Sequence, residues 1–343
     1  MSNQTETDLP IALASDPEMR DLQFVEAGVE ALREEMRRDP AIFYIGQGIG
    51  ARGGNYKQSK GLWEEFGEAR VRDTPISELG QTGFGVGAAM AGFRPIVDIV
   101  FLDMIMEAMG QIVEQAATIH YVSNGRFKVP LVIRAAMGTV RSTGPHHSRC
   151  FYSWFAHIPG LKVVLPSSPR DVKGLLKTAI RDNGPVVFIE HKFMYNKKGK
   201  VPADEYTIPF GQANVCRPGK DLTVLAMSLM VWHALEAADI LASQGISVEV
   251  IDPRTIVPLD KTTILESVKK TGRMLIVDEA QSFCGFSAEA AAVVSEEVLE
   301  YLDAPVKRVC TLPTPHPFNP VLETAMLPSC AKIVAAAREL VGR

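Results

Sequence analysis

Short apolar runs recur along the chain, and segments with helical periodicity separate them. In the first half the runs are residues 41–46, 95–100, 129–134, 161–165 and 185–190. Continuous apolar runs of this length are typical of parallel strands whose two faces are both covered by helices. The order strand, helix, strand, helix therefore predicts an α/β fold built on parallel sheets.

The segments between the runs carry their own helix signals. Ser168 is followed by Pro169 and, three residues on, by Asp171, and this pattern predicts a capped helix start. A final amphipathic helix is predicted for residues 331–340. An apolar stripe at steps of three and four residues predicts another helix, and its members are Ile105, Met109, Ile112, Ala116 and Ile119.

The regular pattern stops between residues 196 and 211, where Lys, Gly and Pro dominate. This composition predicts a linker, and 343 residues are enough for a domain on each side of it. A second α/β unit follows, with strands predicted at 222–227, 247–252, 274–278 and 306–311. We therefore expect a flexible tail (1–21), a first domain (22–197), a linker (198–211) and a second domain (212–343).

Charge, hydropathy and cysteine use argue against several classes of protein. The formal net charge of -4 gives no general attraction to nucleic acid or anionic lipid. No apolar run reaches membrane-spanning length, and the polar first ~20 residues lack a signal-peptide core. The five cysteines form no Cys-x-x-Cys pair. We therefore expect reduced thiols, a cytoplasmic location and neither a nucleic-acid nor a membrane partner.

The most informative polar residue is Glu78, in the stretch DTPISELG. A predicted loop delivers it just before a helix of small residues, GFGVGAAMAG, which allows close approach to a neighbouring element or a ligand. One interpretation is a catalytic carboxylate. The other is a carboxylate that only complements the positive end of the helix, which stabilises by ~1 kcal/mol or less.

A second candidate site is the loop that contains His146 and His147, between a predicted strand and a predicted helix. Histidines in such loops are suited to acid–base catalysis near neutral pH. The alternative interpretation is a solvated loop in which Ser148 caps the following helix.

Common nucleotide and metal motifs are absent from the sequence. GQGIG (46–50) follows a predicted strand, but no helix clearly opens from this loop-like stretch, as a dinucleotide-binding fingerprint requires, so we predict a flexible loop. There is no Gly-Asp-Gly followed by a distant Asn, the pattern that presents magnesium and a diphosphate. A Walker motif, Gly-x-Ser-x-Gly and His-Glu-x-x-His are also missing.

Several blocks of sequence resemble one known family, in the family's own order. They are DTPISELG, GAAMAGFRPI, HHS, WFAHIPGLKVVLPSSPRDVKGLLKTAIRDNGPVVFIEHK, EVIDPRTIVPLD and SVKKTGRMLIVDEA. From residue 22 to the C-terminus the chain resembles the beta subunit of the thiamine-diphosphate-dependent first component of 2-oxo acid and acetoin dehydrogenase complexes. The later stretch VPADEYTIPFG is most similar to acetoin dehydrogenase beta subunits.

The resemblance implies a transketolase-like pyrimidine-binding domain followed by a transketolase C-terminal α/β domain. It also implies an alpha2–beta2 heterotetramer in which thiamine diphosphate lies between subunits and the alpha subunit holds diphosphate and magnesium. The missing Gly-Asp-Gly motif agrees with this division. The complex would decarboxylate a small 2-oxo acid, such as pyruvate or a branched-chain acid, or cleave acetoin. It would then pass the acyl group to the lipoyl acyltransferase core.

The resemblance also implies roles for individual residues. Glu78 matches the glutamate that shares a proton with the aminopyrimidine ring of the cofactor and so activates it. Ile76 and Met104 match residues beside that ring. His147 matches the histidine near the reacting centre, where it would serve acid–base or lipoyl steps, and His146 is a weaker candidate.

A monovalent-cation site, for potassium, is a further implication of the resemblance. Its ligands would be backbone carbonyls, and the alternative is ordinary carbonyls that face water. The matching positions are Leu131, Ala179, Asp182 and Gly184.

The chain departs from the family pattern at a few positions near the site. Met104 stands where relatives often have an aromatic residue, and Gln47 stands where many have an acidic one. Arg141 and Pro145 are also atypical, which leaves an altered substrate open. Two rival functions remain: a two-subunit transketolase-type enzyme and a non-catalytic assembly subunit.

Overall fold

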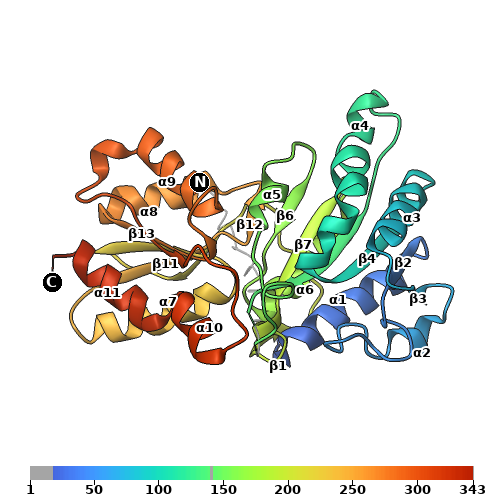
Figure 1. Ribbon diagram of the computed structural model, residues 1–343, viewed down its shortest axis with the longest axis horizontal. Coiled ribbons are helices and arrows are strands. Elements are labelled where there is room, and N and C mark those ends of the chain that lie inside the picture. The colour runs from blue at the N-terminus through green and yellow to red at the C-terminus, as the bar shows by residue number, and fades with distance from the viewer. Residues whose placement is uncertain (1–17, 140–141, 343) are drawn as a thin grey trace, which may run out of the picture.

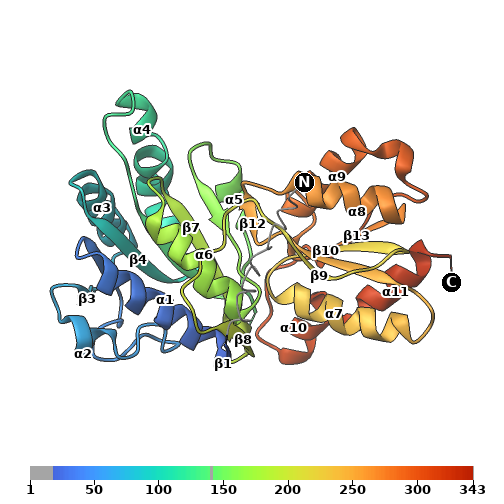
Figure 2. The ribbon, with the colours of Figure 1, turned by 180° about the vertical axis from the view of Figure 1, so that it is seen from behind.

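The computed structural model describes residues 18–139 and 142–342, which form two lobes (Figure 1). Each lobe is built on its own mainly parallel sheet, and helices lie on both faces of each sheet (Figures 1 and 2). The α/β fold expected from the apolar runs is confirmed.

The sheet of the N-terminal lobe includes one strand from the other lobe. Its order is β12 (Thr255–Val257), β6 (Lys162–Val164), β7 (Val186–His191), β5 (Val132–Met137), β4 (Arg94–Phe101), β2 (Ile42–Gly46) and β3 (Val71–Asp73). Neighbouring strands are parallel except that β12, which comes from the C-terminal half of the chain, pairs antiparallel with β6. A strand from the C-terminal half of the chain therefore forms one edge of the N-terminal sheet.

Successive residues of the central strands face different helical layers. In β4, Ile96 belongs to the apolar cluster of α1 (Phe24–Arg38) and α6 (Pro169–Arg181). The next residue, Val97, belongs to the cluster that includes α3 (Glu78–Met90). Strands buried on both faces need apolar side chains at every position, which explains the continuous runs. The short helices of this lobe include α2 (Leu62–Phe66), α5 (Ser153–Ala156) and η3 (Lys192–Met194).

The apolar stripe from Ile105 to Ile119 is helical, but it is not one α-helix. A 3₁₀ helix η1 (Leu102–Ala108) is followed by a π-helix η2 (Gly110–Ala116) and a short α4 (Ile119–Val122). The prediction of a single regular helix is therefore wrong in its winding, although the stripe does face the core. Long π-helical segments are rare and often lie beside functional sites.

The C-terminal lobe repeats the same architecture. Its sheet has the order β14 (Lys307–Thr311), β13 (Met274–Gln281), β10 (Leu222–Ala226), β11 (Val248–Asp252) and β9 (Asn214–Arg217). β9 is antiparallel to β11, and the other neighbours are parallel. The helices are α7 (Leu229–Ala242), α8 (Lys261–Thr271), α9 (Phe286–Glu297), η4 (Leu299–Tyr301), α10 (Pro320–Met326) and α11 (Cys330–Leu340). The predicted final helix is thus confirmed.

The segment from Pro320 to Leu340 has the length and apolarity of a membrane span. In the structure it is divided between α10 and α11, so it is not one continuous α-helix. Ile333 and Ala337 of α11 are buried in the apolar cluster with α7 and the sheet. Packing in the C-terminal core accounts for this apolar composition.

Two segments differ from the predicted tail and linker. β1 (Met19–Gln23) pairs antiparallel with β8 (Lys198–Pro202). The prediction of a flexible tail is therefore wrong for residues 19–21, which belong to β1. The prediction of a linker is wrong for residues 198–202, which form β8. Residues 1–17 lie outside the described part of the chain. The remaining domain boundaries stay predictions.

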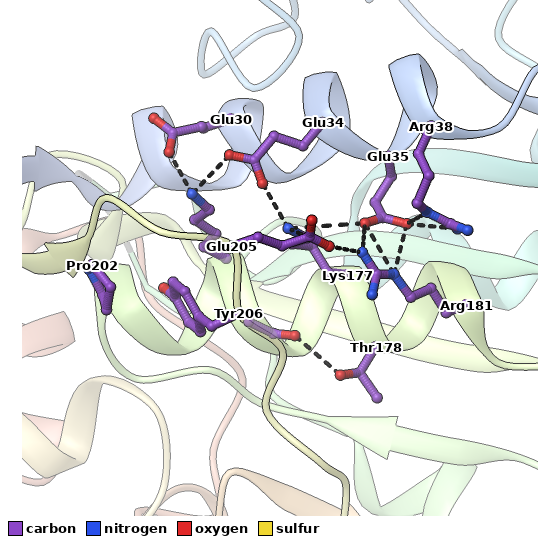
Figure 3. Close-up of polar contacts among 12 residues, drawn as sticks. Glu30, Glu34, Glu35, Arg38, Lys177, Thr178, Arg181, Pro202, Glu205 and Tyr206 are labelled. Atoms are coloured by element: carbon purple, nitrogen blue, oxygen red, sulfur yellow. Dashed lines mark hydrogen bonds and ion pairs between the residues drawn. The ribbon is translucent and has the colours of Figure 1, made fainter. Parts of the chain in front are cut away.

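Helices α1 and α6 are joined by a row of ion pairs (Figure 3). Lys177 lies 2.6 Å from Glu34, and Arg181 lies 2.6 Å from Glu35. Lys173 bridges Glu30 and Glu34. Lys173 and Lys177 are almost fully buried, so each needs these carboxylates to compensate for lost hydration. The row fixes the register of two helices that cover the same face of the sheet.

Buried polar contacts hold the two lobes together. Tyr152 of the N-terminal lobe donates a hydrogen bond of 2.5 Å to Asp278 of β13. His191, at the end of β7, contacts Glu279 at 2.7 Å. One apolar cluster also extends from the N-terminal sheet into the C-terminal sheet. These contacts give the two lobes a common interior.

Asp278 makes the free energy of unfolding depend on pH. Burial raises the pKa of Asp278 to about 6, although hydrogen bonds from Tyr152 and Ala280 favour its charged form. Because an aspartate in the unfolded chain titrates near 3.9, the folded state binds more protons between about pH 4 and 6. Stability from this group is present below about pH 4 and is lost as the pH rises to about 6, by roughly 2–3 kcal/mol.

Asp278→Asn should remove this part of the pH dependence because asparagine does not titrate. Urea unfolding of both proteins near pH 4 and near pH 7 measures the difference, and the exposed Asp204→Asn serves as the control. An unchanged difference between the two pH values in Asp278→Asn would show that another group is responsible.

Candidate active site at the start of α3

Hydrogen bonds fix the start of α3 at the carboxyl edge of the N-terminal sheet. The Thr74 amide donates to the Gly46 carbonyl at the end of β2. The Thr74 hydroxyl donates to the Gln81 side chain, at 2.7 Å, and the Gln81 amide donates to the Asp98 carbonyl, at 3.2 Å. Ligands of parallel α/β folds commonly bind at this edge.

Glu78 is the first residue of α3, not the last residue of a preceding loop as predicted. Its side chain is half-buried and makes no hydrogen bond or ion pair with the described residues. Ile76 and Leu79 beside it are 72% and 52% exposed, and Met104 on η1 is half-buried. Its near neighbours in the sequence are therefore exposed apolar side chains, and the carboxyl group remains available to a group from outside the chain.

Glycine allows α3 to lie close to the sheet. A Cβ on Gly85 would be 2.6 Å from the Val97 side chain and 3.2 Å from Leu131. On the other side of the helix, Gly80 and Gly87 are exposed. The small residues predicted to permit close approach thus serve packing on the sheet, and the exposed glycines leave room for close approach on the outer face.

A buried polar network lies on the opposite face of the sheet, next to α1. Asp98 accepts hydrogen bonds from the Tyr44 hydroxyl and, at 3.2 Å, from Gln58. Arg134 donates to Tyr44 at 3.1 Å and forms a bidentate pair with Glu190 at 2.8 and 2.9 Å. Burial opposes the charge of Arg134, but Glu190 and its neighbours raise the pKa of Arg134 well above its ordinary value. The sequence did not reveal this network.

A bulge in β4 turns Phe101 toward the histidine loop. Val100 has a φ of 65°, which is strained for a β-branched residue, and its amide donates to the Asp98 carboxylate at 2.8 Å. The register with β5 shifts between Asp98 and Phe101. Phe101 then contacts the His147 ring edge-on, with centroids 4.7 Å apart. Bulges often redirect a side chain beside an active site.

His147 is half-buried, whereas His146 is exposed. The buried Lys192 donates to the main-chain carbonyl of His147. Ser148 is hydrogen bonded to Thr143 at 2.7 Å, and α5 begins only at Ser153. The alternative in which Ser148 caps the next helix is therefore wrong.

The glycine-rich loop after β2 has the predicted irregular structure. Gly48 has a positive φ of 68°, and the Gly50 amide donates to Asp73 at 2.8 Å. No helix opens within 46–60, so the geometry of a dinucleotide fingerprint is absent from this described segment. Gln47 is half-buried in this loop. Pro145 is half-buried near the histidines, and Arg141 lies outside the described residues.

Three of the proposed potassium ligands, Ala179, Asp182 and Gly184, lie at or just after the C-terminus of α6, and Leu131 directly precedes β5. The Leu131 carbonyl accepts from Val186 at 2.9 Å, and the Ala179 carbonyl accepts from Asp182 at 3.3 Å. Each oxygen keeps a second lone pair. The Asp182 carbonyl, however, accepts from the Arg94 guanidinium, whose charge opposes a nearby cation. Gly184 donates its amide to the Asp182 carboxylate at 2.7 Å.

Side-chain metal ligands are not clustered in this structure. Residues 18–139 and 142–342 contain no group of three His, Cys, Asp or Glu side chains arranged to hold a metal ion. The five cysteines are free thiols.

Comparisons with known proteins agree with this architecture. Residues 20–198 match the family model "Transketolase, pyrimidine binding domain", and residues 211–333 match "Transketolase, C-terminal domain". A solved "Split gene transketolase, inactive beta4 tetramer" superposes with a TM-score of 0.77 at 22% identity, over 93% of this chain and 98% of that chain. The fold and the matched domains thus define a transketolase-like chain.

Three curated relatives are each 45% identical to the chain. The 2-oxoisovalerate dehydrogenase subunit beta of Bacillus subtilis aligns over 93% of this chain and 98% of its own length. The acetoin:2,6-dichlorophenolindophenol oxidoreductase subunit beta of Cupriavidus necator aligns over 90% of this chain and 94% of its own length. The pyruvate dehydrogenase E1 component subunit beta-2 of Oryza sativa aligns over 91% of this chain and 84% of its own length. The chain belongs to the family of beta subunits of thiamine-diphosphate-dependent 2-oxo acid and acetoin dehydrogenase components.

Proposed function

We propose that this chain is the beta subunit of an enzyme that decarboxylates a 2-oxo acid or cleaves acetoin and transfers the acyl group to a lipoyl domain. The observation that carries the proposal is Glu78. Its carboxyl group opens α3 at the carboxyl edge of the sheet, is free of partners among the described residues and lies beside exposed apolar side chains. This arrangement suits a planar, basic ring that another subunit helps to hold.

Several residues of the chain would have separate roles at this site. When bound, thiamine diphosphate would supply the carbon nucleophile that attacks the substrate carbonyl. Glu78 would exchange a proton with the pyrimidine ring nitrogen. Ile76 and Met104 would contact the ring, with Met104 using its polarisable sulfur. His147 would exchange a proton with the substrate or the lipoyl group.

The proposal includes an alpha subunit in an alpha2–beta2 assembly. The outer face of α3 exposes Leu79 and Phe84 next to Gly80 and Gly87, a surface on which another helix can pack closely. The alpha subunit would hold the diphosphate and magnesium, because the sequence of this chain lacks the Gly-Asp-Gly pattern. The lipoyl acyltransferase core would be the second partner, and we place the complex in the cytoplasm.

Reconstitution with an alpha subunit of the same family tests the proposal. Thiamine diphosphate should bind the complex and not the isolated beta chain, and one of pyruvate, a branched-chain 2-oxo acid or acetoin should be turned over. Binding without turnover of these substrates, together with ketol transfer between sugar phosphates, would support the transketolase-type rival. A complex that binds no cofactor would indicate an assembly subunit.

We also propose that potassium binds the carbonyls of Leu131, Ala179, Asp182 and Gly184. KCl in place of NaCl at equal ionic strength should then raise the thermal midpoint of the beta chain by about 2–4 °C, as expected for ~1 kcal/mol of binding. The gain is small because Arg94 already donates to the Asp182 carbonyl. Equal thermal midpoints in the two salts, measured by calorimetry, would show that potassium does not bind at these carbonyls.

A further inference from the structure

The C-terminal lobe contacts the segment that leads to His147 at three points. Glu279 of β13 accepts from the Thr139 amide at 2.9 Å. Glu323 of α10 accepts from the Ser142 amide at 3.1 Å. At Gly144, a Cβ would lie 2.2 Å from a ring carbon of Phe318, so this ring packs directly on the Gly144 backbone.

A second connection reaches His147 from the other side. Glu279 also contacts His191 at 2.7 Å, and the next residue, Lys192, donates to the His147 carbonyl. Lys192 lies 5.4 Å from the Phe101 ring, which itself packs against the His147 ring. The backbone and the ring of this histidine are thus both held.

The free energy of folding does not explain why Glu323 is buried. The residue is only 6% exposed, and its Oε1 atom has no hydrogen-bond partner within the described residues. Burying a carboxylate for one backbone hydrogen bond is unfavourable for folding. Its one partner, Ser142, has a strained φ of 60°. Burial lowers the pKa of Lys192, and Asp103, Glu279 and Glu323 act in the opposite direction.

We propose that Glu323 is a positioning residue for His147. By accepting the Ser142 N–H, it holds the segment that leads into the histidine loop, and Phe318 and Glu279 support the same segment. The C-terminal lobe would thereby set the geometry of an acid–base step in the N-terminal lobe. The inference rests on the proposed function, because it assigns His147 a chemical role.

The test compares Glu323→Ala with Glu323→Gln in the complex with the alpha subunit. Alanine removes the acceptor, so kcat for acyl transfer to lipoamide should fall about 10- to 100-fold, with the KM for thiamine diphosphate unchanged. Glutamine keeps an acceptor oxygen and should restore activity to near the wild-type level. Glu296→Ala, an exposed change on α9, is the control for general effects. Equal activity of Glu323→Ala and wild type would overturn the proposal.

A double-mutant cycle shows whether Glu323 acts through His147. In a His147→Ala background, Glu323→Ala should cause no further loss, whereas a full additional loss would refute the coupling. The His147 ring signals in an NMR spectrum of the isolated beta chain should shift in Glu323→Ala and not in Glu323→Gln. If His147→Ala itself keeps full activity, the role of His147 in the proposed function fails. That outcome is distinct from failure at Glu323.

Discussion

Replacing Glu78 by glutamine is expected to lower thiamine-diphosphate-dependent turnover of the alpha–beta complex at least about 100-fold. Glutamine has nearly the same shape but cannot give or take the proton that the ring nitrogen requires. Glu78 makes no hydrogen bond to the described residues, so the substitution should leave folding and assembly intact. Steady-state rates and the sedimentation of the complex measure these two effects separately.

Glu64→Gln is a matched control for this substitution. Glu64 lies in the first turn of α2, as Glu78 lies in the first turn of α3, so both variants lose a similar interaction with a helix end. Glu64→Gln should keep wild-type turnover. Full activity of Glu78→Gln would instead mean that Glu78 only complements its helix, which is the alternative that the sequence left open.

Replacing Arg134 by methionine should destabilise the N-terminal domain by about 3–5 kcal/mol. The Arg134 and Glu190 side chains are 1% and 0% exposed, so removal of the guanidinium leaves an uncompensated buried carboxylate. The Tyr44 hydroxyl and the Gln58 carbonyl also lose a hydrogen-bond donor. Urea unfolding of the isolated beta chain, followed by near-ultraviolet circular dichroism, measures the loss.

The double variant Arg134→Met, Glu190→Met should recover part of this loss, because the Glu190 carboxylate is then no longer buried without its cationic partner. Lys200→Met is the exposed control, since the Lys200 and Asp21 side chains are 62% and 61% exposed. We expect Lys200→Met to change the free energy of unfolding by less than about 1 kcal/mol. A similar small effect of Arg134→Met would contradict the importance assigned to the buried pair.

The sequence predicted that the apolar strands exist and missed the short strands rich in polar residues. β2 and β7 were predicted to within one residue because a strand buried on both faces must be apolar throughout. β5 was predicted three residues too early, since Pro130 and Leu131 extend the apolar run without joining the strand. β1 and β8 were missed because they are half-exposed and rich in polar residues.

The candidate site was predictable only where its residues share a local motif. Glu78 stands out beside a run of small residues, and His147 stands out in a histidine loop. Arg134 and Glu190 are 56 residues apart, and Ser142 and Glu323 are 181 residues apart. Their pairing depends on how the lobes pack, and no spacing in one sequence reports that. The π-helical conformation of η2 could not be predicted either, because an apolar stripe does not distinguish a π-helix from an α-helix.

The pairing of β1 with β8 has a consequence for synthesis of the chain. This ribbon joins segments far apart in the sequence, and beside it the Arg20 guanidinium donates to the Pro202 carbonyl, 182 positions away. A ribosome adds about 5–20 residues per second, so β1 waits on the order of ten seconds or more before β8 emerges. The nascent domain therefore stays open at its beginning until its end has been translated, and a chain cut before residue 198 would leave β1 without its hydrogen-bonding neighbour.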